Sequence, residues 1–161
     1  MRLFRRGLLH PFLGSALLAV FLLACGCRTV TQNLFTASGP GWRLQQGQAL
    51  WRPRGGLPEI GGDLVLAGDA DGRRLVQFDK TPLSMVLAEI TPARWLIRFP
   101  QRQMAFSGHG PGPARFAWLY LPAALERKKL PPPLRFERKP DGRWQLENIR
   151  TGEMLEGFLS P

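Results

Sequence analysis

The sequence contains few cysteines and histidines. Its 161 residues include two cysteines, Cys25 and Cys27, which are separated by one glycine, and two histidines, His10 and His109. Cysteines this close together provide no disulfide framework and no cysteine metal site for a folded domain. We therefore expect packing to stabilise the fold, and we predict neither a metal nor any other cofactor.

The residue patterns of common enzymes are also missing. The chain has no G-x-S-x-G, S-x-x-K, H-E-x-x-H or P-loop sequence. His109 lies among glycines and prolines, where it is simplest to interpret it as a solvated loop residue. Of the acid pairs, Asp69 and Asp71 fall in a predicted turn, and Glu153 and Glu156 flank a strand that we expect to be exposed. We therefore predict no catalytic residues and no enzymatic activity.

Acidic residues are too few to balance the basic ones. There are 22 Lys and Arg against 12 Asp and Glu, which gives a net charge of +10. A surface this basic suits an acidic neighbour such as phospholipid head groups, lipopolysaccharide or nucleic acid. The length allows one domain with a core. The 18 glycines and 15 prolines favour short strands joined by many turns.

The N-terminus has the pattern of a secretory signal. Arg2, Arg5 and Arg6 precede an uncharged, mostly apolar run of 13 residues at 12–24. A membrane-spanning helix needs about 20 such residues, so this run is too short to cross a bilayer. We predict that residues 1–24 are removed. This takes away three arginines and no acid, and leaves +7 of the original +10.

The end of this run resembles the lipobox of bacterial lipoproteins. Leu22, Leu23 and Ala24 directly precede Cys25. The resemblance implies that Cys25 is the lipid attachment site, and that two or three acyl chains hold the protein to a membrane. Gly26, where a retention signal would have Asp, implies sorting to the outer membrane, facing the periplasm. Nucleic acid is then not an expected partner.

Cys27 leaves alternatives open at this site. It follows Gly26 and is a second, poorer candidate for lipid attachment. It could also be a bystander or form a strained disulfide with Cys25.

The predicted mature chain divides into two parts. Residues 25–41 have the polar composition of a flexible tether, and residues 42–161 form a single β-rich domain. Two β-prone runs flank the Asp-Gly turn at 69–72 and predict a hairpin. Strands are also predicted at 84–90 and 93–99. The second of these places Trp95, Ile97 and Phe99 on one side.

The C-terminal half adds a further strand, a helix and a meander. A short strand before Gly108 leads to a Gly/Pro loop, and a short helix is predicted near 122–129 with Pro122 in its first turn. Turns at 140–142 and 150–152 separate three more strands. With seven or eight strands, the fold class is mainly β: a curved antiparallel sheet that wraps one short helix, or an open half-barrel.

The aromatic residues allow two interpretations. Five tryptophans and many phenylalanines can form a core of large side chains, or some can line a cavity open to an acyl chain. The candidate cavity residues are Phe78, Leu87, Trp95, Ile97 and Phe99. The basic residues Arg52, Arg54, Arg73, Arg74, Arg94, Arg98 and Arg102, with 127–129, can form either a solvated face or a face close to lipid head groups.

Residues 62–108 resemble the Lol lipoprotein-localisation family in the order of their elements. Thr81-Pro82-Leu83 stands at the x-x-P-L step of that family, and residues 122–129 stand where a lid helix would lie. The resemblance implies an incomplete barrel that accepts the acyl chains of other lipoproteins. The alternative is a structural or interaction lipoprotein, with a filled core, that binds another envelope protein.

Overall fold

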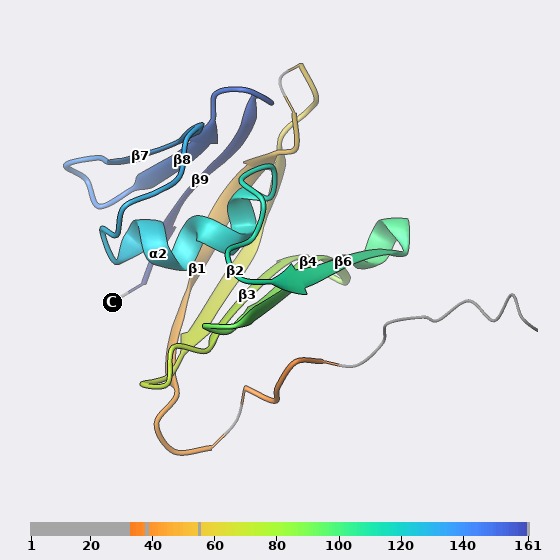
Figure 1. Ribbon diagram of the computed structural model, residues 1–161. Helices are drawn as coiled ribbons and strands as arrows, with labels where there is room; N and C mark the ends of the chain where they lie inside the picture. The colour runs from red at the N-terminus through yellow and green to blue at the C-terminus, as the bar shows by residue number, and fades with distance from the viewer. Residues whose placement is uncertain (1–32, 38, 55, 161) are drawn as a thin grey trace, which may run out of the picture. The chain divides into compact units, whose positions relative to one another are not determined.

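The computed structural model describes residues 33–37, 39–54 and 56–160, which contain a nine-stranded antiparallel sheet (Figure 1). Its strands are β1 (Arg43–Arg52), β2 (Ile60–Gly68), β3 (Arg74–Lys80), β4 (Leu83–Ile90), β5 (Arg94–Phe99), β6 (Met104–His109), β7 (Leu134–Arg138), β8 (Trp144–Asn148) and β9 (Glu153–Leu159). Their order is β6-β5-β4-β3-β2-β1-β9-β8-β7. Strands β6 and β7 form the two edges, so the sheet is open. The predicted mainly-β class with a curved, open antiparallel sheet is confirmed.

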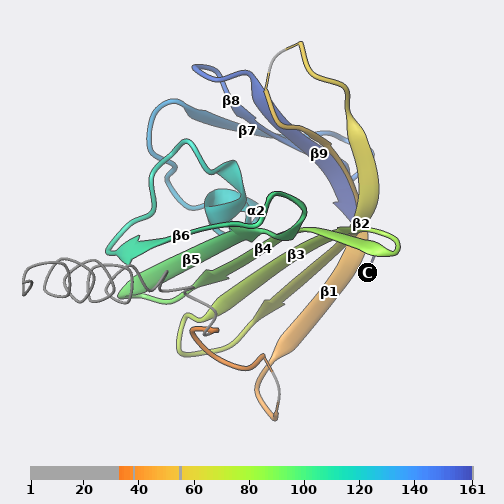
Figure 2. The ribbon, with the colours of Figure 1, turned by 90° about the vertical axis from the view of Figure 1, so that its right-hand side faces the viewer.

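One short helical segment covers the concave face of this sheet (Figure 2). It consists of the 3-10 turn η2 (Ala117–Tyr120) and the helix α2 (Leu121–Leu125), which follow β6 and precede β7. Pro122 lies in the first turn of α2, as predicted. The helix ends at Leu125 rather than near 129, because Arg127 adopts a left-handed conformation with φ of 57°.

The predicted hairpin turns are present. Asp69 Oδ1 accepts a hydrogen bond of 3.0 Å from the Arg73 amide, and Gly72 supplies the positive φ in this turn. Gly142 and Gly152 supply it in the β7–β8 and β8–β9 turns. A further 3-10 turn, η1 (Pro100–Arg102), joins β5 to β6. The structure also has β1 at 43–52, where no strand was predicted.

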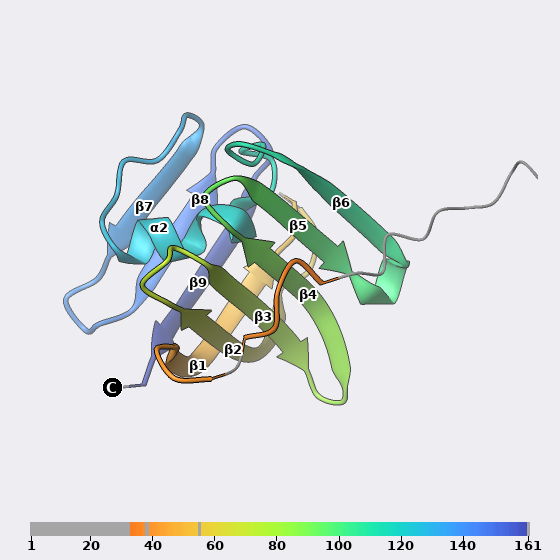
Figure 3. The same cartoon turned by 60° about the horizontal axis from the view of Figure 1, so that its bottom comes forward.

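The connections lie at two opposite ends of the strands, since every neighbouring pair is antiparallel. Rim 1 comprises the β1–β2, β3–β4, β5–β6 and β8–β9 connections with the residues that flank them. Rim 2 comprises the β2–β3, β4–β5 and β7–β8 connections. In Figure 3, the β3–β4 turn and η1 lie at the right-hand ends of the strands, and the β7–β8 turn lies at the left.

Small residues allow the sheet to bend sharply across β2, β1 and β9. Gly62 of β2 lies opposite Ala49 of β1, which in turn lies opposite Gly157 of β9. A Cβ atom on Gly157 would approach the Gln48 carbonyl oxygen to 2.3 Å, and one on Gly62 would approach the Asp79 carbonyl oxygen to 2.2 Å. Neither position has space for a side chain, so the bend depends on glycine there.

We expect Gly157→Ala to lower the free energy of unfolding by about 2–3 kcal/mol, because the added methyl group forces backbone displacement. Gly61→Ala is the matched control on the same bend. Its Cβ would meet only the Leu50 Cδ2 atom, at 3.4 Å. Urea unfolding of both variants measures the difference. Equal stability of the two variants would show that the close approach does not constrain the sheet.

Candidate functional site

The concave face carries four of the five candidate cavity residues. Trp95, Ile97 and Phe99 alternate along β5 and all contact the buried core, as the period of two predicted. Phe78 of β3 belongs to the same core, because it lies opposite Val86 of β4 on the same side of the sheet. Phe78 and Ile97 are completely buried.

Leu87 is separated from these four residues. It lies opposite Gln77 of β3 and Arg98 of β5, whereas its neighbours Val86 and Ala88 face the core. Side chains alternate between the two faces of a strand, so Leu87 points to the outer face. Its assignment to the cavity was wrong.

The interior of the curve is occupied by Trp118 from η2. Its ring stacks on Phe78 at a centroid distance of 5.1 Å and meets Trp51 edge-on at 5.8 Å. Trp118 is completely buried. Local sequence patterns predicted a short helix near 122–129 but not the burial of Trp118 in the core.

A chain of aromatic rings leads from this interior towards the β6 edge. Phe99 stacks on Trp51 at 6.1 Å and contacts Phe106 of β6 at 6.5 Å, and Phe106 contacts Phe116 at 5.1 Å. Unlike Trp118, the three phenylalanines are only partly buried. The concave face is therefore closed at its centre and partly open near β6.

A buried carboxylate connects the covering segment to the sheet. Glu153 of β9 accepts a hydrogen bond of 3.1 Å from Trp51 Nε1 and another of 3.2 Å from the Ala117 amide. Burial raises the pKa of Glu153 to about 7, although the two hydrogen bonds act in the opposite direction. The expectation of an exposed acid pair at this strand is wrong for Glu153, because residues 153 and 156 lie on opposite faces.

Unpaired indole nitrogens also lie inside the domain. Among the described residues, Trp95 Nε1, Trp118 Nε1 and Trp144 Nε1 are buried without a hydrogen-bond partner. Buried donors of this kind are normally paired in folded proteins. The apolar interior therefore contains donor groups that a carbonyl oxygen would satisfy.

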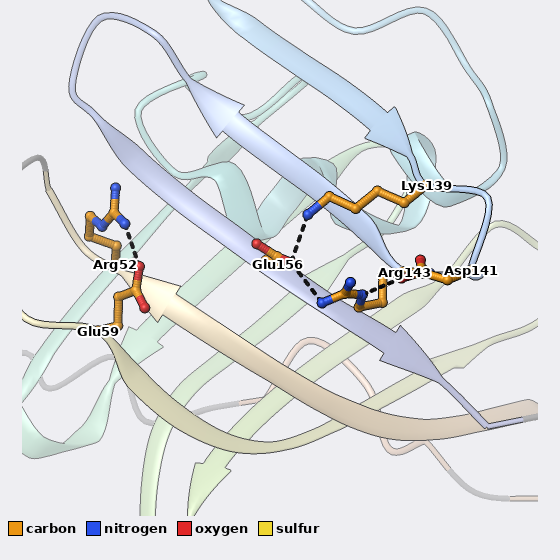
Figure 4. A network of polar contacts seen from close by, with 6 residues as sticks. All are labelled: Arg52, Glu59, Lys139, Asp141, Arg143 and Glu156. Atoms are coloured by element: carbon orange, nitrogen blue, oxygen red, sulfur yellow. Dashed lines mark hydrogen bonds and ion pairs between the residues drawn. The ribbon is translucent and has the colours of Figure 1, made fainter.

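The outer face carries a polar network centred on Glu156 (Figure 4). Glu156 Oε1 lies 2.8 Å from Lys139 Nζ and 3.8 Å from Arg143 Nη1, and Arg143 Nε also pairs with Asp141 at 2.7 Å. A cleft of about 490 Å³ adjoins this network. It is lined by Gln48, Ala49, Leu50, Gly61, Gly62, Asp63, Arg143, Glu156, Gly157 and Phe158.

A second cleft, of about 300 Å³, lies between α2 and rim 2. Its apolar wall includes Ile90, Leu119 and Pro122, and its charged residues include Arg74, Glu126 and Lys128. Arg74 Nε lies 3.0 Å from one Glu126 oxygen, and Lys128 Nζ lies 2.6 Å from the other. None of the five predicted cavity residues lines either cleft.

The other candidate groups are dispersed. His109 is exposed at the end of β6, and Asp69 and Asp71 lie in the β2–β3 turn, where both contact Arg73. Within the described ranges, no three His, Cys, Asp or Glu side chains are grouped to hold a metal ion.

The predicted basic residues do not share one face. Arg54 and Arg102 belong to rim 1, whereas Arg73 and Arg94 lie at rim 2, and Arg98 lies within β5 on the outer face. The prediction of a single basic face was therefore wrong. Charge on this domain has to be considered separately at each end.

The lipid attachment candidates Cys25 and Cys27 lie outside the described residues. Part of the predicted tether is described, and it lies against the outer face. The Leu34 amide donates a hydrogen bond to Glu89, and Arg98 Nη1 donates one of 2.6 Å to Asn33 Oδ1. Phe35 stacks on Trp42 at 5.4 Å. These residues are held to the sheet and do not form a free tether.

Compared with family models, curated proteins and solved structures, the chain matches none. No helix in the described part of the chain is both long enough and apolar enough to span a membrane.

Proposed function

We propose that this protein is an outer-membrane lipoprotein, anchored through Cys25 and facing the periplasm, that binds an apolar ligand on the concave face of its sheet. The observation that carries this proposal is an aromatic concave face covered by one short segment between two unjoined edge strands. Movement of that segment would admit a ligand without breaking a strand pair. The acyl chains of other lipoproteins are the ligands that the Lol resemblance implies.

The row of contacting aromatic rings from Trp51 to Phe116 suits an acyl chain as the ligand. Each methylene removed from water contributes about 0.8 kcal/mol, and the partly buried Phe99, Phe106 and Phe116 provide the contact surface. An ester or amide carbonyl of the ligand would accept a hydrogen bond from the unpaired indole of Trp95 or Trp118.

Photo-crosslinking tests the ligand site. Cells that express the full chain are fed a photoactivatable fatty acid, and crosslinked peptides are identified by mass spectrometry. The proposed anchor would itself incorporate the labelled fatty acid. In addition, we expect adducts in the peptides that contain Phe99, Phe106 and Phe116. Adducts confined to the outer face, for example at Phe158, would contradict binding on the concave face.

One observation favours the alternative of a structural or interaction lipoprotein. Phe78, Ile97 and Trp118 are completely buried, so the centre of the curve is filled by the chain itself. This alternative predicts that the domain retains no lipid and gives no adducts on the concave face. The same experiment therefore distinguishes the two functions.

We expect Cys25→Ala to abolish incorporation of radiolabelled fatty acid and to release the protein from the outer-membrane fraction, because the acyl chains provide the attachment. Cys27→Ala is the matched control and should keep both the label and the location. If only the Cys27 variant lost the label, the lipid would be assigned to Cys27 instead of Cys25. Unlabelled wild-type protein would exclude the anchor.

A further inference from the structure

Exposed apolar side chains concentrate at rim 1. Leu57 in the β1–β2 connection is 46% exposed, Leu83 after the β3–β4 turn 46%, Met104 after η1 38%, and Ile149 in the β8–β9 connection 49%. Each of the four connections at this end thus contributes one large apolar residue. The other exposed large apolar residues in the described chain, Leu44, Leu50 and Phe158, lie within β1 and β9.

Each of the same four connections also carries an exposed cation: Arg54, Lys80, Arg102 and Arg150. None of these four forms an ion pair with another described residue. Of the acids near this end, Glu59 pairs with Arg52, whereas Asp63 accepts a hydrogen bond from Thr81 and Asp79 accepts one from Gln77. Rim 1 therefore combines apolar side chains with four unpaired cations, which outnumber the two unpaired acids beside them in the described chain.

Rim 2 differs from rim 1 in its apolar side chains rather than in its charge. Its acids Asp69, Asp71 and Asp141 are paired with Arg73 and Arg143, but Arg94 and Arg138 beside its connections are exposed and form no ion pair with a described residue. Its connections expose no large apolar side chain among the described residues. The two ends of the sheet thus differ in exposed apolar surface, while both carry unpaired cations.

The N-terminal segment also leads to rim 1. Asn33 is held by Arg98, the residue before Phe99 and η1, whereas Leu34 is held by Glu89, closer to rim 2. Followed backwards from Trp42, the chain runs along the outer face from rim 2 towards rim 1. The described chain therefore begins, at Asn33, on the rim 1 side of the outer face.

We infer that rim 1 docks on an anionic bilayer surface, with its apolar side chains in the interface and its cations against lipid phosphates. This inference rests on the proposed membrane anchor and adds an orientation to it. A cation near an anionic surface strengthens binding about fivefold. Apolar residues next to cations are the combination that interfacial binding uses.

Depth-dependent quenching tests the orientation. Leu57→Cys, Leu83→Cys, Met104→Cys and Ile149→Cys are introduced singly into the full chain with Cys27→Ser, and each is labelled with an environment-sensitive dye. The lipid-anchored protein is placed in vesicles that contain anionic phospholipid and lipids with a quencher in the acyl chain. Leu44→Cys and Ala70→Cys are the controls, since both positions are exposed and distant from rim 1.

We expect at least twofold stronger quenching at the four rim 1 positions than at the two controls, and a fall towards control values in vesicles without anionic lipid. Replacing Arg54 and Arg150 with glutamine should cause a similar fall. Two results would overturn the inference. One is equal quenching at both ends of the sheet. The other is a rim 1 dye that is shielded from aqueous iodide but is not quenched by the lipid, as expected for contact with a protein. Failure of the anchor is a separate result, because it appears as loss of the protein from vesicles in high salt.

Discussion

Replacing Trp118 with alanine is expected to lower the free energy of unfolding by about 3–5 kcal/mol, the range for removing a fully buried tryptophan. The side chain fills the centre of the curve and contacts Phe78 and Trp51. Its indole nitrogen has no hydrogen-bond partner among the described residues, so the loss comes from packing. Urea unfolding at neutral pH measures the change.

Trp42→Ala is the matched control, because it removes the same side chain from a partly exposed site before β1. There we expect a loss below about 1.5 kcal/mol, in line with partial burial. The Trp118 variant should also bind an apolar dye more tightly than the wild type does, since the substitution leaves a cavity lined by aromatic rings. A loss below 1 kcal/mol at Trp118 would mean that the segment contributes little to the core.

The second large effect concerns pH. Burial raises the pKa of Glu153 from an ordinary value of 4.5 to about 7, so the folded protein binds a proton more tightly than the unfolded chain does. The resulting stability is fully present below pH 4.5 and is lost as the pH rises through about 7. A shift of this size corresponds to roughly 3 kcal/mol. Urea unfolding should therefore show a more stable protein at pH 5 than at pH 8.

Glu153→Gln should remove most of this dependence, because glutamine does not ionise between pH 5 and 8. Glu156→Gln, three residues along the same strand but on the outer face, should keep it. Loss of the pH dependence in both variants, or in neither, would assign it to another group. Since Glu153 also accepts the hydrogen bond from Ala117, tryptophan fluorescence of Trp118 provides a second readout of the same titration.

Local patterns were sufficient to predict much of the sheet. Strand β5 follows from the alternation of Trp95, Ile97 and Phe99 with polar or outward residues, and three hairpin turns follow from Asp-Gly or Thr-Gly pairs. These features depend only on residues within a few positions of one another. The open antiparallel class follows from the number of such strands and turns.

Long-range features were not predictable in this way. Strand β4 has four apolar residues in succession, 85–88, so no alternation identified Leu87 as outward-facing. Glu153 is buried because Trp51, 102 residues away, and Ala117, 36 residues away, reach its oxygens. The central position of Trp118 likewise depends on where the segment crosses the sheet.

The basic residues illustrate the same limit. Adjacent arginines in the sequence, such as Arg73 and Arg74, have different partners, since the first pairs with Asp69 and the second with Glu126. Charge counts alone cannot show which cations are compensated. Arg54 and Arg94, for example, both lack an ion pair among the described residues but lie at opposite ends of the sheet.

The hydrogen bonds that join Asn33 to Arg98 and Leu34 to Glu89 also limit the distance between the domain and its proposed anchor. Only eight peptide units separate Cys25 from Asn33. Even fully stretched, they span at most about 28 Å. With Cys25 acylated, as proposed, Asn33 would stay within that distance of the membrane surface, and a ligand would have to be brought to the domain there.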